Sequence, residues 1–210
     1  MGRRRRMSEH DGQSFAVREA RADDTERMSA AHAAATVALG RAAYDERQVR
    51  AWARGRYEYP VSEESAVGGD GVRLVVAVRE RAQRPENGPD ADYDEVLGFG
   101  ELHAEAGDYL SGVAGRSASG CTSERRSDAV EGEVRAVYVH PAFARQGVGS
   151  ALYADLERWA RERGVDSLGL WASLNAVGFY ERQGFERVAE HDHEFAGDVA
   201  ATVAEMRKSL

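Results

Sequence analysis

The sequence predicts an α/β fold, because strand-like and helix-like patterns alternate along a chain long enough for one domain with a sizeable core. The clearest unit is residues 133–164, EVRAVYVHPAFARQGVGSALYADLERWARERG. Its valines predict a strand that ends at His140-Pro141, and the apolar residues that follow at spacings of three and four predict a helix. A similar strand–helix–strand pattern follows over residues 168–195.

The first two helices are predicted by their capping residues. Asp23 or Asp24 is a candidate N-cap for a helix that ends at Gly40. The sequence Asp-Glu-Arg-Gln at 45–48 resembles a capping box, which opens a second helix that ends at Gly55. Both helices precede the first long apolar strand.

Strands are expected where apolar residues alternate with polar ones or run together. In chain order they are residues 15–19, 72–78, 96–103, 133–139, 168–171, 186–195 and 199–206. Gly98 and Gly100 interrupt one strand, and loose packing explains them more simply than a bulge or a close approach to a ligand. Between strands, residues 83–95 predict a turn or hairpin tip, and residues 104–132 predict a long loop.

The composition argues against several classes of function. A net charge of −8 disfavours a general nucleic-acid binder, and no apolar run is long enough to cross a membrane. The single cysteine, Cys121, fits a reducing compartment, so we expect a cytoplasmic protein. Residues 1–14 predict a disordered extension whose arginine run lacks the apolar stretch of an export signal, with translation starting at Met1 or Met7.

Two histidines near the C-terminus have a spacing that would place them on one face of a strand. His191 and His193 flank Asp192, which alternates onto the other face. A metal site needs a third ligand, and the sequence fixes none. We therefore expect a solvated hairpin here and no metal.

The turn between the strand and the helix of residues 133–164 has the chemistry of an anion site. Unpaired backbone N–H groups and the positive end of the helix dipole meet there, which suits a phosphate or pyrophosphate. A dinucleotide fingerprint would require glycine at Leu152, and a P-loop would require a lysine, but the only lysine is Lys208. The candidate phosphate-binding residues are Arg145, Gln146, Gly147, Val148, Gly149 and Ser150.

This turn resembles motif A of the GNAT superfamily of N-acetyltransferases, Arg/Gln-x-x-Gly-x-Gly/Ala. Here the motif falls on Ala144 to Gly149, with alanine at its first position. Asn175 to Phe185, NAVGFYERQGF, resembles motif B, with Gly178 where alanine is frequent. The resemblance implies a GNAT domain over residues 15–210, with a mixed, mainly antiparallel sheet, helices on both faces and acetyl-CoA as co-substrate.

The resemblance also implies how the acetyl donor is held. The pyrophosphate would sit on the turn, and the pantetheine arm would pair with the main chain of Val137 and Val139. A backbone N–H at Val139 or an adjacent residue would stabilise the oxyanion. Asn175 matches an asparagine that hydrogen-bonds the cofactor, and it is also a candidate helix N-cap.

Two catalytic roles follow from the same resemblance. Tyr180 matches a tyrosine that protonates the departing CoA thiolate, and its alternative role is packing against neighbouring phenylalanines. Glu133 matches a glutamate that deprotonates the amine through water. Glu101 and His103, on the preceding strand, are rival candidates for this base.

The predicted function is transfer of an acetyl group from acetyl-CoA directly to a small-molecule or peptide amine. The alternative is a non-catalytic acyl-CoA-binding sensor or an interaction module that keeps only the fold. We expect no nucleic-acid or membrane partner, while homodimers are frequent in the family. The first helical pair flanks the acceptor site in GNAT folds, so four aromatic residues there are candidates either to line it or only to pack: Tyr44, Trp52, Tyr57 and Tyr59.

Overall fold

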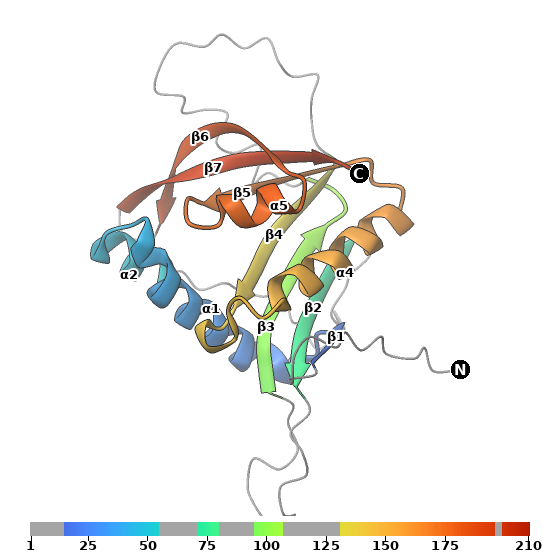
Figure 1. Ribbon diagram of the computed structural model, residues 1–210, viewed down its shortest axis with the longest axis horizontal. Helices are drawn as coiled ribbons and strands as arrows, with labels where there is room; N and C mark the ends of the chain where they lie inside the picture. Colours follow the sequence, from blue (N-terminus) through green and yellow to red (C-terminus); the bar gives the residue numbers. More distant parts are fainter. Residues whose placement is uncertain (1–14, 55–70, 80–94, 107–130, 196–198) are drawn as a thin grey trace, which may run out of the picture.

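The computed structural model describes residues 15–54, 71–79, 95–106, 131–195 and 199–210 (Figure 1). Its longer helices are α1 (Thr25–Leu39), α2 (Glu46–Arg54), α4 (Val148–Glu162) and α5 (Val177–Arg182), and its 3-10 helices are η1 (Ala22–Asp24), η2 (Gly40–Ala42) and η3 (Pro141–Phe143). Its strands are β1 (Ala16–Glu19), β2 (Val72–Arg79), β3 (Glu95–His103), β4 (Gly132–Val139), β5 (Ser167–Ser173), β6 (Glu186–Phe195) and β7 (Val199–Ser209). Residues 1–14, the hairpin tip predicted at 83–95 (apart from Glu95) and most of the predicted loop at 104–132, with Cys121, lie outside the described residues.

These strands form a seven-stranded sheet in the order β1-β2-β3-β4-β5-β7-β6. Every neighbouring pair is antiparallel except β4 and β5, which are parallel. The parallel pair is formed by the two units predicted at residues 133–164 and 168–195, because helix α4 carries the chain back along the sheet between them. The predicted mixed, mainly antiparallel sheet is confirmed.

Helices cover both faces of this sheet, as the sequence predicts. In Figure 1, α4 crosses the strands on the near side and α1 crosses them on the far side. The alternation of β2 explains this arrangement, since Val76 packs in the cluster under α1 and Val75 packs in the cluster under α4. Leu152 and Leu156 of α4 are fully buried, and burial of each contributes roughly 1.5–3 kcal/mol.

The two glycines of β3 are tightly packed, so loose packing was the wrong interpretation. A Cβ atom at Gly98 would lie 2.5 Å from the carbonyl oxygen of Tyr138, and one at Gly100 would lie 3.0 Å from Leu156 Cδ1. Glycine lets β4 approach on one side and α4 on the other. The bulge considered for this strand is also present, because the register with β2 shifts between Ala77 and Val78.

The caps of the first two helices differ in their chemistry. The capping box of α2 is confirmed: the Gln48 N–H donates to Asp45 Oδ1 at 2.8 Å, and the Asp45 N–H donates to Gln48 Oε1 at 3.1 Å. Asp24 is the N-cap residue of α1, but its carboxylate accepts from Arg18 at 2.7 and 3.0 Å rather than from the helix. The sequence therefore predicts correctly that Asp24 is an N-cap residue, but the Asp24 side chain binds Arg18 of β1 instead of capping the helix.

Candidate active site

Strands β4 and β5 separate soon after they pair. Their register covers only Gly132 with Leu168 and Glu133 with Gly169, and the strands diverge beyond it (Figure 1). A bulge lies at the same place, since Leu102 pairs with Val134 but Glu101 pairs with Ala136. The inserted residue, Arg135, bends β4 away from β5. The rest of β4 therefore has a neighbour on one side only.

The backbone N–H groups of Val137 and Val139 point into the space between β4 and β5. The N–H of His140 donates to the Leu97 carbonyl of β3 at 2.9 Å. Because successive N–H groups of a strand point in opposite directions, that of Tyr138 also faces β3, and those of Val137 and Val139 face away from it. These are the two residues predicted to meet the pantetheine arm.

The predicted anion-binding turn lies at the open end of this space. Gly147 is the N-cap of α4 with a φ of 82°, and Arg145 has a φ of 65°, so the turn contains two left-handed residues. The first intrahelical hydrogen bond runs from the Ala151 N–H to the Gly147 carbonyl at 3.0 Å. The N–H groups at 148–150 precede that bond and lie at the positive end of the helix dipole.

The remaining predicted phosphate-binding residues shape the turn. Gln146 Nε2 donates to the Ala142 carbonyl at 3.1 Å, which ties the turn back to η3. Gln183 Nε2 lies 3.5 Å from Ser150 Oγ, which links α4 to the end of α5. A Cβ atom at Gly149 would lie at ordinary contact distances, 3.4 Å from Phe179 and 3.5 Å from Val139. The space available at Gly149 is thus compatible with alanine, whereas the backbone at Gly147 favours glycine.

Asn175 does not open a helix. Helix α5 begins at Val177 with Ala176 as its N-cap, so the helix predicted from residue 175 starts later and the N-cap interpretation was wrong. Residues 174–176 form a turn between β5 and α5, in which the Asn175 side chain is exposed. The exposed amide is available to a ligand.

Tyr180 combines a buried ring with a hydroxyl that has no hydrogen-bond partner among the described residues. Its ring packs edge-to-face against Phe179 at 5.0 Å and Phe185 at 5.7 Å, so the packing role considered for it is real. Burial raises the pKa of Tyr180 well above its ordinary value of 10.0. The phenol therefore stays protonated at neutral pH, which is the state that a general acid requires.

The three candidate bases lie on the face of the sheet that α1 covers. Leu102 and Val134 pack under α4, so the alternation of β3 and β4 places Glu101, His103 and Glu133 on the opposite face. Glu101 and Glu133 are 2% and 1% exposed. His103 pairs with Glu133 in register, and its Nε2 lies 2.6 Å from Glu101 Oε1.

The sequence interpretation missed that the candidate bases form one group. The signal was present, since residues two apart on a strand share a face, and Glu101 and His103 have that spacing. It also missed Arg135, whose Nε lies 3.8 Å from Glu133 Oε1. The contact between Glu133 and Arg135 depends on the bulge in β4, and no residue pattern in the sequence indicates that bulge.

The early aromatic residues within the described chain hold the fold together. Tyr44 is buried, its hydroxyl donates to the Thr202 carbonyl at 2.8 Å, and it accepts from the Leu174 N–H at 2.9 Å. Trp52 packs edge-to-face on Tyr44 at 5.5 Å. Tyr57 and Tyr59 lie outside the described residues. Tyr44 therefore has a packing and hydrogen-bonding role within the fold, and its role in acceptor binding stays a prediction.

The histidine pair of β6 takes part in side-chain packing. His191 Nε2 lies 2.7 Å from Glu205 Oε2, and both His191 and His193 pack against Trp171. Within the described residues, no cluster of three or more potential metal ligands is found. In the same part of the chain, no helix has the length and apolar character needed to span a membrane.

Solved structures of similar fold come from several organisms. A GCN5-related N-acetyltransferase from Rhodopseudomonas palustris is 22% identical with a TM-score of 0.66, over 96% of this chain and 100% of the other. The PaiA N-acetyltransferase from Thermoplasma acidophilum, solved with coenzyme A, is 17% identical with a TM-score of 0.57, over 93% and 99%. The yncA protein from Salmonella typhimurium, solved with acetyl-CoA, is 18% identical with a TM-score of 0.51, over 93% and 94%.

The family follows from the sequence model that matches the chain. No curated protein is similar enough to count as a match. The model of the acetyltransferase (GNAT) family matches residues 73–185, more than half of the 210 residues, and spans β2 through the end of α5. This match includes the β4–β5 separation, the turn before α4 and Tyr180. The chain belongs to the GNAT acetyltransferase family, and it is therefore an acyltransferase with acetyl-CoA as its acyl donor.

Proposed function

We propose that this protein transfers the acetyl group of acetyl-CoA directly to an amine, with the donor extended between β4 and β5. The observation that carries the proposal is the short parallel ladder, which ends after Glu133 and leaves the N–H groups of Val137 and Val139 facing an open strand edge. An extended pantetheine arm can pair with such an edge as an added strand would. The same edge leads to the N-terminus of α4, where a pyrophosphate is stabilised.

Cofactor contacts follow from this placement. The N–H groups of Gly147 to Ser150 and the side chain of Arg145 would bind the pyrophosphate, with Gln146 fixing the turn. Asn175, in the turn after β5, would donate a hydrogen bond to the pantetheine from the β5 side of the space. The Val139 N–H is our candidate donor to the oxyanion of the tetrahedral intermediate, because it points into the space that the thioester would occupy.

Two side chains on different elements complete the chemistry. Glu133 removes a proton from the attacking amine through water, and the amine nitrogen then bonds to the thioester carbonyl carbon. When the intermediate collapses, the C–S bond breaks and the sulfur takes the Tyr180 proton. Tyr180 supports this role through its protonated state and through a hydroxyl that no described residue engages.

The test is release of CoA from acetyl-CoA, followed with a thiol reagent, in the presence of different amines. A polyamine, a peptide with a free N-terminus, and an N-terminally blocked peptide with one lysine separate the acceptor classes. Reactions without amine correct for the thiol of Cys121. Amine-dependent CoA release supports the proposal. Binding of acetyl-CoA without release with any amine would instead favour a non-catalytic acyl-CoA sensor.

A further inference from the structure

Two carboxylates are buried on the same face of neighbouring strands, which is unusual without a function. Glu101 of β3 and Glu133 of β4 are almost completely inaccessible. Burial of a charge is costly unless it is paired and hydrogen-bonded. Glu101 Oε2 accepts no hydrogen bond from the described residues, so this carboxylate is only half satisfied. The Glu133 role explains one carboxylate and leaves Glu101 unexplained.

His103 connects these two carboxylates to the surface. Its Nε2 lies 2.6 Å from Glu101 Oε1, and its side chain is directly across from Glu133 in the β3–β4 register. Side chains directly across an antiparallel pair have Cβ atoms about 4.5–5.5 Å apart. The His103 side chain is 21% exposed, against 3% for Glu101. It is therefore the member of the group that reaches solvent.

The contact with Glu101 orients the ring of His103. When Glu101 is ionised, its carboxylate only accepts hydrogen bonds, and Nε2 of His103 is then the donor. In a neutral imidazole this leaves Nδ1 with a lone pair. A buried carboxylate that orients an imidazole through one ring nitrogen is the arrangement by which an acid–base histidine is prepared.

We propose that His103, oriented by Glu101, carries the proton of the acetyl acceptor from Glu133 to solvent. This inference rests on the proposed function, in which Glu133 is the base. The amine N–H bond breaks as Glu133 gains the proton. The proton then passes through a bridging water to His103 Nδ1, the Glu101 carboxylate compensates the imidazolium charge, and Nδ1 releases the proton to bulk water. Each turnover thereby returns Glu133 to its ionised state.

The charged surroundings fit this path. Arg135 of β4 places its Nε 3.8 Å from Glu133 Oε1. From β5, the residue in register with Glu133 is Gly169, and beyond it Arg207 of β7 binds Glu205 at 2.8 Å. From β2, the residue in register with His103 is Val72. His103 is thus the partly exposed titratable group that lies in register with Glu133.

The test compares His103→Gln with His191→Gln as a matched control. His191 forms an equally close histidine–glutamate pair, at 2.7 Å, but on β6, away from Glu133. We expect kcat of His103→Gln to fall about tenfold or more, with the KM for acetyl-CoA little changed. Added imidazole should restore part of this rate, because it can accept the proton in place of the missing ring. The Glu133→Gln variant should gain nothing from imidazole.

A second measurement does not depend on turnover. Long-range proton–nitrogen NMR correlations of the wild-type protein, assigned by comparison with His103→Gln and recorded where the ring is neutral, should show a proton on Nε2 and none on Nδ1. Amine-dependent CoA release by the wild type, with a His103→Gln rate equal to that of His191→Gln, would overturn the relay alone. A slow His103→Gln enzyme that imidazole does not rescue would also overturn it, because the loss would then be structural. Wild-type protein that releases no CoA with any amine would overturn the proposed function, and the relay with it.

Discussion

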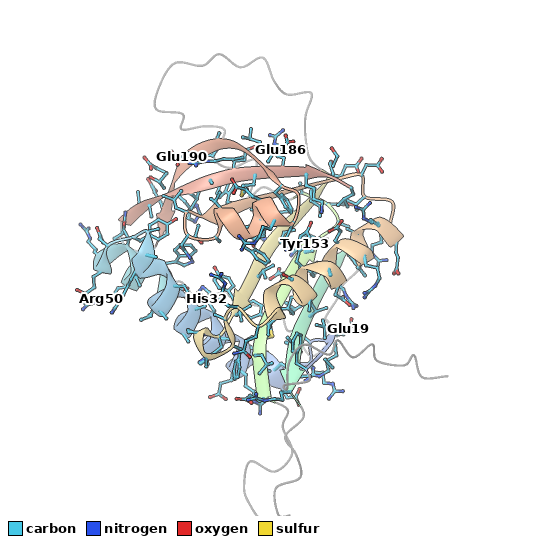
Figure 2. The ribbon with its side chains drawn as sticks, in the orientation of Figure 1. Glu19, His32, Arg50, Tyr153, Glu186 and Glu190 are labelled. Atoms are coloured by element: carbon cyan, nitrogen blue, oxygen red, sulfur yellow. The ribbon has the colours of Figure 1, made fainter. Side chains whose placement is uncertain are left out.

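Lys208, the only lysine of the chain, is half-buried where three elements meet. Its Nζ donates to Glu157 Oε2 at 2.9 Å, to the Gln183 carbonyl at 2.6 Å and to the Tyr153 hydroxyl at 3.3 Å. Tyr153 lies on the side of α4 that faces α5 (Figure 2). A compact ammonium can serve three acceptors around one atom, which the planar guanidinium of arginine cannot. Lys208 thus joins β7 to α4 and to the turn after α5, next to Tyr180.

We expect Lys208→Met to lower the free energy of unfolding by about 3 kcal/mol, because it leaves the half-buried Glu157 carboxylate with fewer partners. The matched control is Arg161→Met, which removes the other cation bound to Glu157 at 2.7 Å but from an exposed position, and should cost less than about 1 kcal/mol. Urea denaturation measures both variants. Equal losses would show that burial at Lys208 is unimportant.

The pH dependence of this loss has a defined sign. Burial alone would raise the pKa of Glu157, but the hydrogen bonds and charges of Lys208 and Arg161 hold it below its ordinary value of 4.5. A carboxyl group with a lowered pKa in the folded state stabilises the protein above its unfolded pKa, and that stability is lost as the pH falls through the folded value. The difference between wild type and Lys208→Met should therefore be full at neutral pH and shrink in acid.

Tyr180→Phe should reduce kcat about 100-fold while leaving the thermal midpoint nearly unchanged, because the hydroxyl has no partner among the described residues. Burial raises the pKa of Tyr180 above 10.0, so the wild-type pH–rate profile should show no loss from phenol ionisation up to about pH 10. Steady-state kinetics on both proteins provide the check. A fully active Tyr180→Phe enzyme would assign this residue to packing alone.

His32, on α1 (Figure 2), should make the protein less stable in mild acid. Its ring packs edge-to-face on Tyr138 at 4.5 Å, and burial lowers the pKa of His32 from 6.5 to about 4. As the pH falls from 6.5 towards 4, His32 becomes protonated in the unfolded chain but stays neutral in the folded protein. This difference lowers the free energy of unfolding by up to about 3 kcal/mol. Urea denaturation at several pH values should show the free energy of unfolding of the wild type falling relative to that of His32→Gln over that range. A constant difference would contradict the burial of a neutral ring.

At the scale of elements, helix α4 carries a left-handed glycine just beyond each end. Gly147 precedes it with a φ of 82°, and Gly164 follows it with a φ of 75°. A Cβ atom would meet nothing within 4 Å at either position. Alanine at either position therefore introduces the same backbone strain, about 1 kcal/mol, without a clash. Only the Gly147 end faces the space between β4 and β5.

This pair separates binding from folding. Gly147→Ala and Gly164→Ala should lose similar stability in the absence of ligand, but only Gly147→Ala should bind CoA more weakly, by about tenfold, because its N–H groups are misaligned with the pyrophosphate. Titration calorimetry with CoA measures the affinities. Equal CoA affinity in the two variants would remove the turn from the cofactor site.

At the scale of the whole molecule, the described sheet consists of two antiparallel parts, β1 to β4 and β5 with β7 and β6, joined by a two-residue parallel ladder. The α4 packing face was predictable because its apolar residues recur at helical spacing, and the α2 capping box was predictable because it is local. The two-residue ladder and the Arg135 bulge were not predictable, since both depend on how strands distant in the sequence pair. The same limit applies to Glu101 and His103, whose hydrogen bond the sequence spacing permits but does not specify.

The central claim is that the space between β4 and β5, ending at the turn before α4, holds the acetyl donor. The most direct test is the thermal unfolding midpoint of the full chain with acetyl-CoA, with CoA and with NAD, because a ligand that binds only the native state raises that midpoint. We expect acetyl-CoA and CoA to raise it for the wild type and for Gly164→Ala, much less for Gly147→Ala, and NAD to leave all three unchanged. A folded wild-type protein whose midpoint neither CoA species moves would contradict the claim.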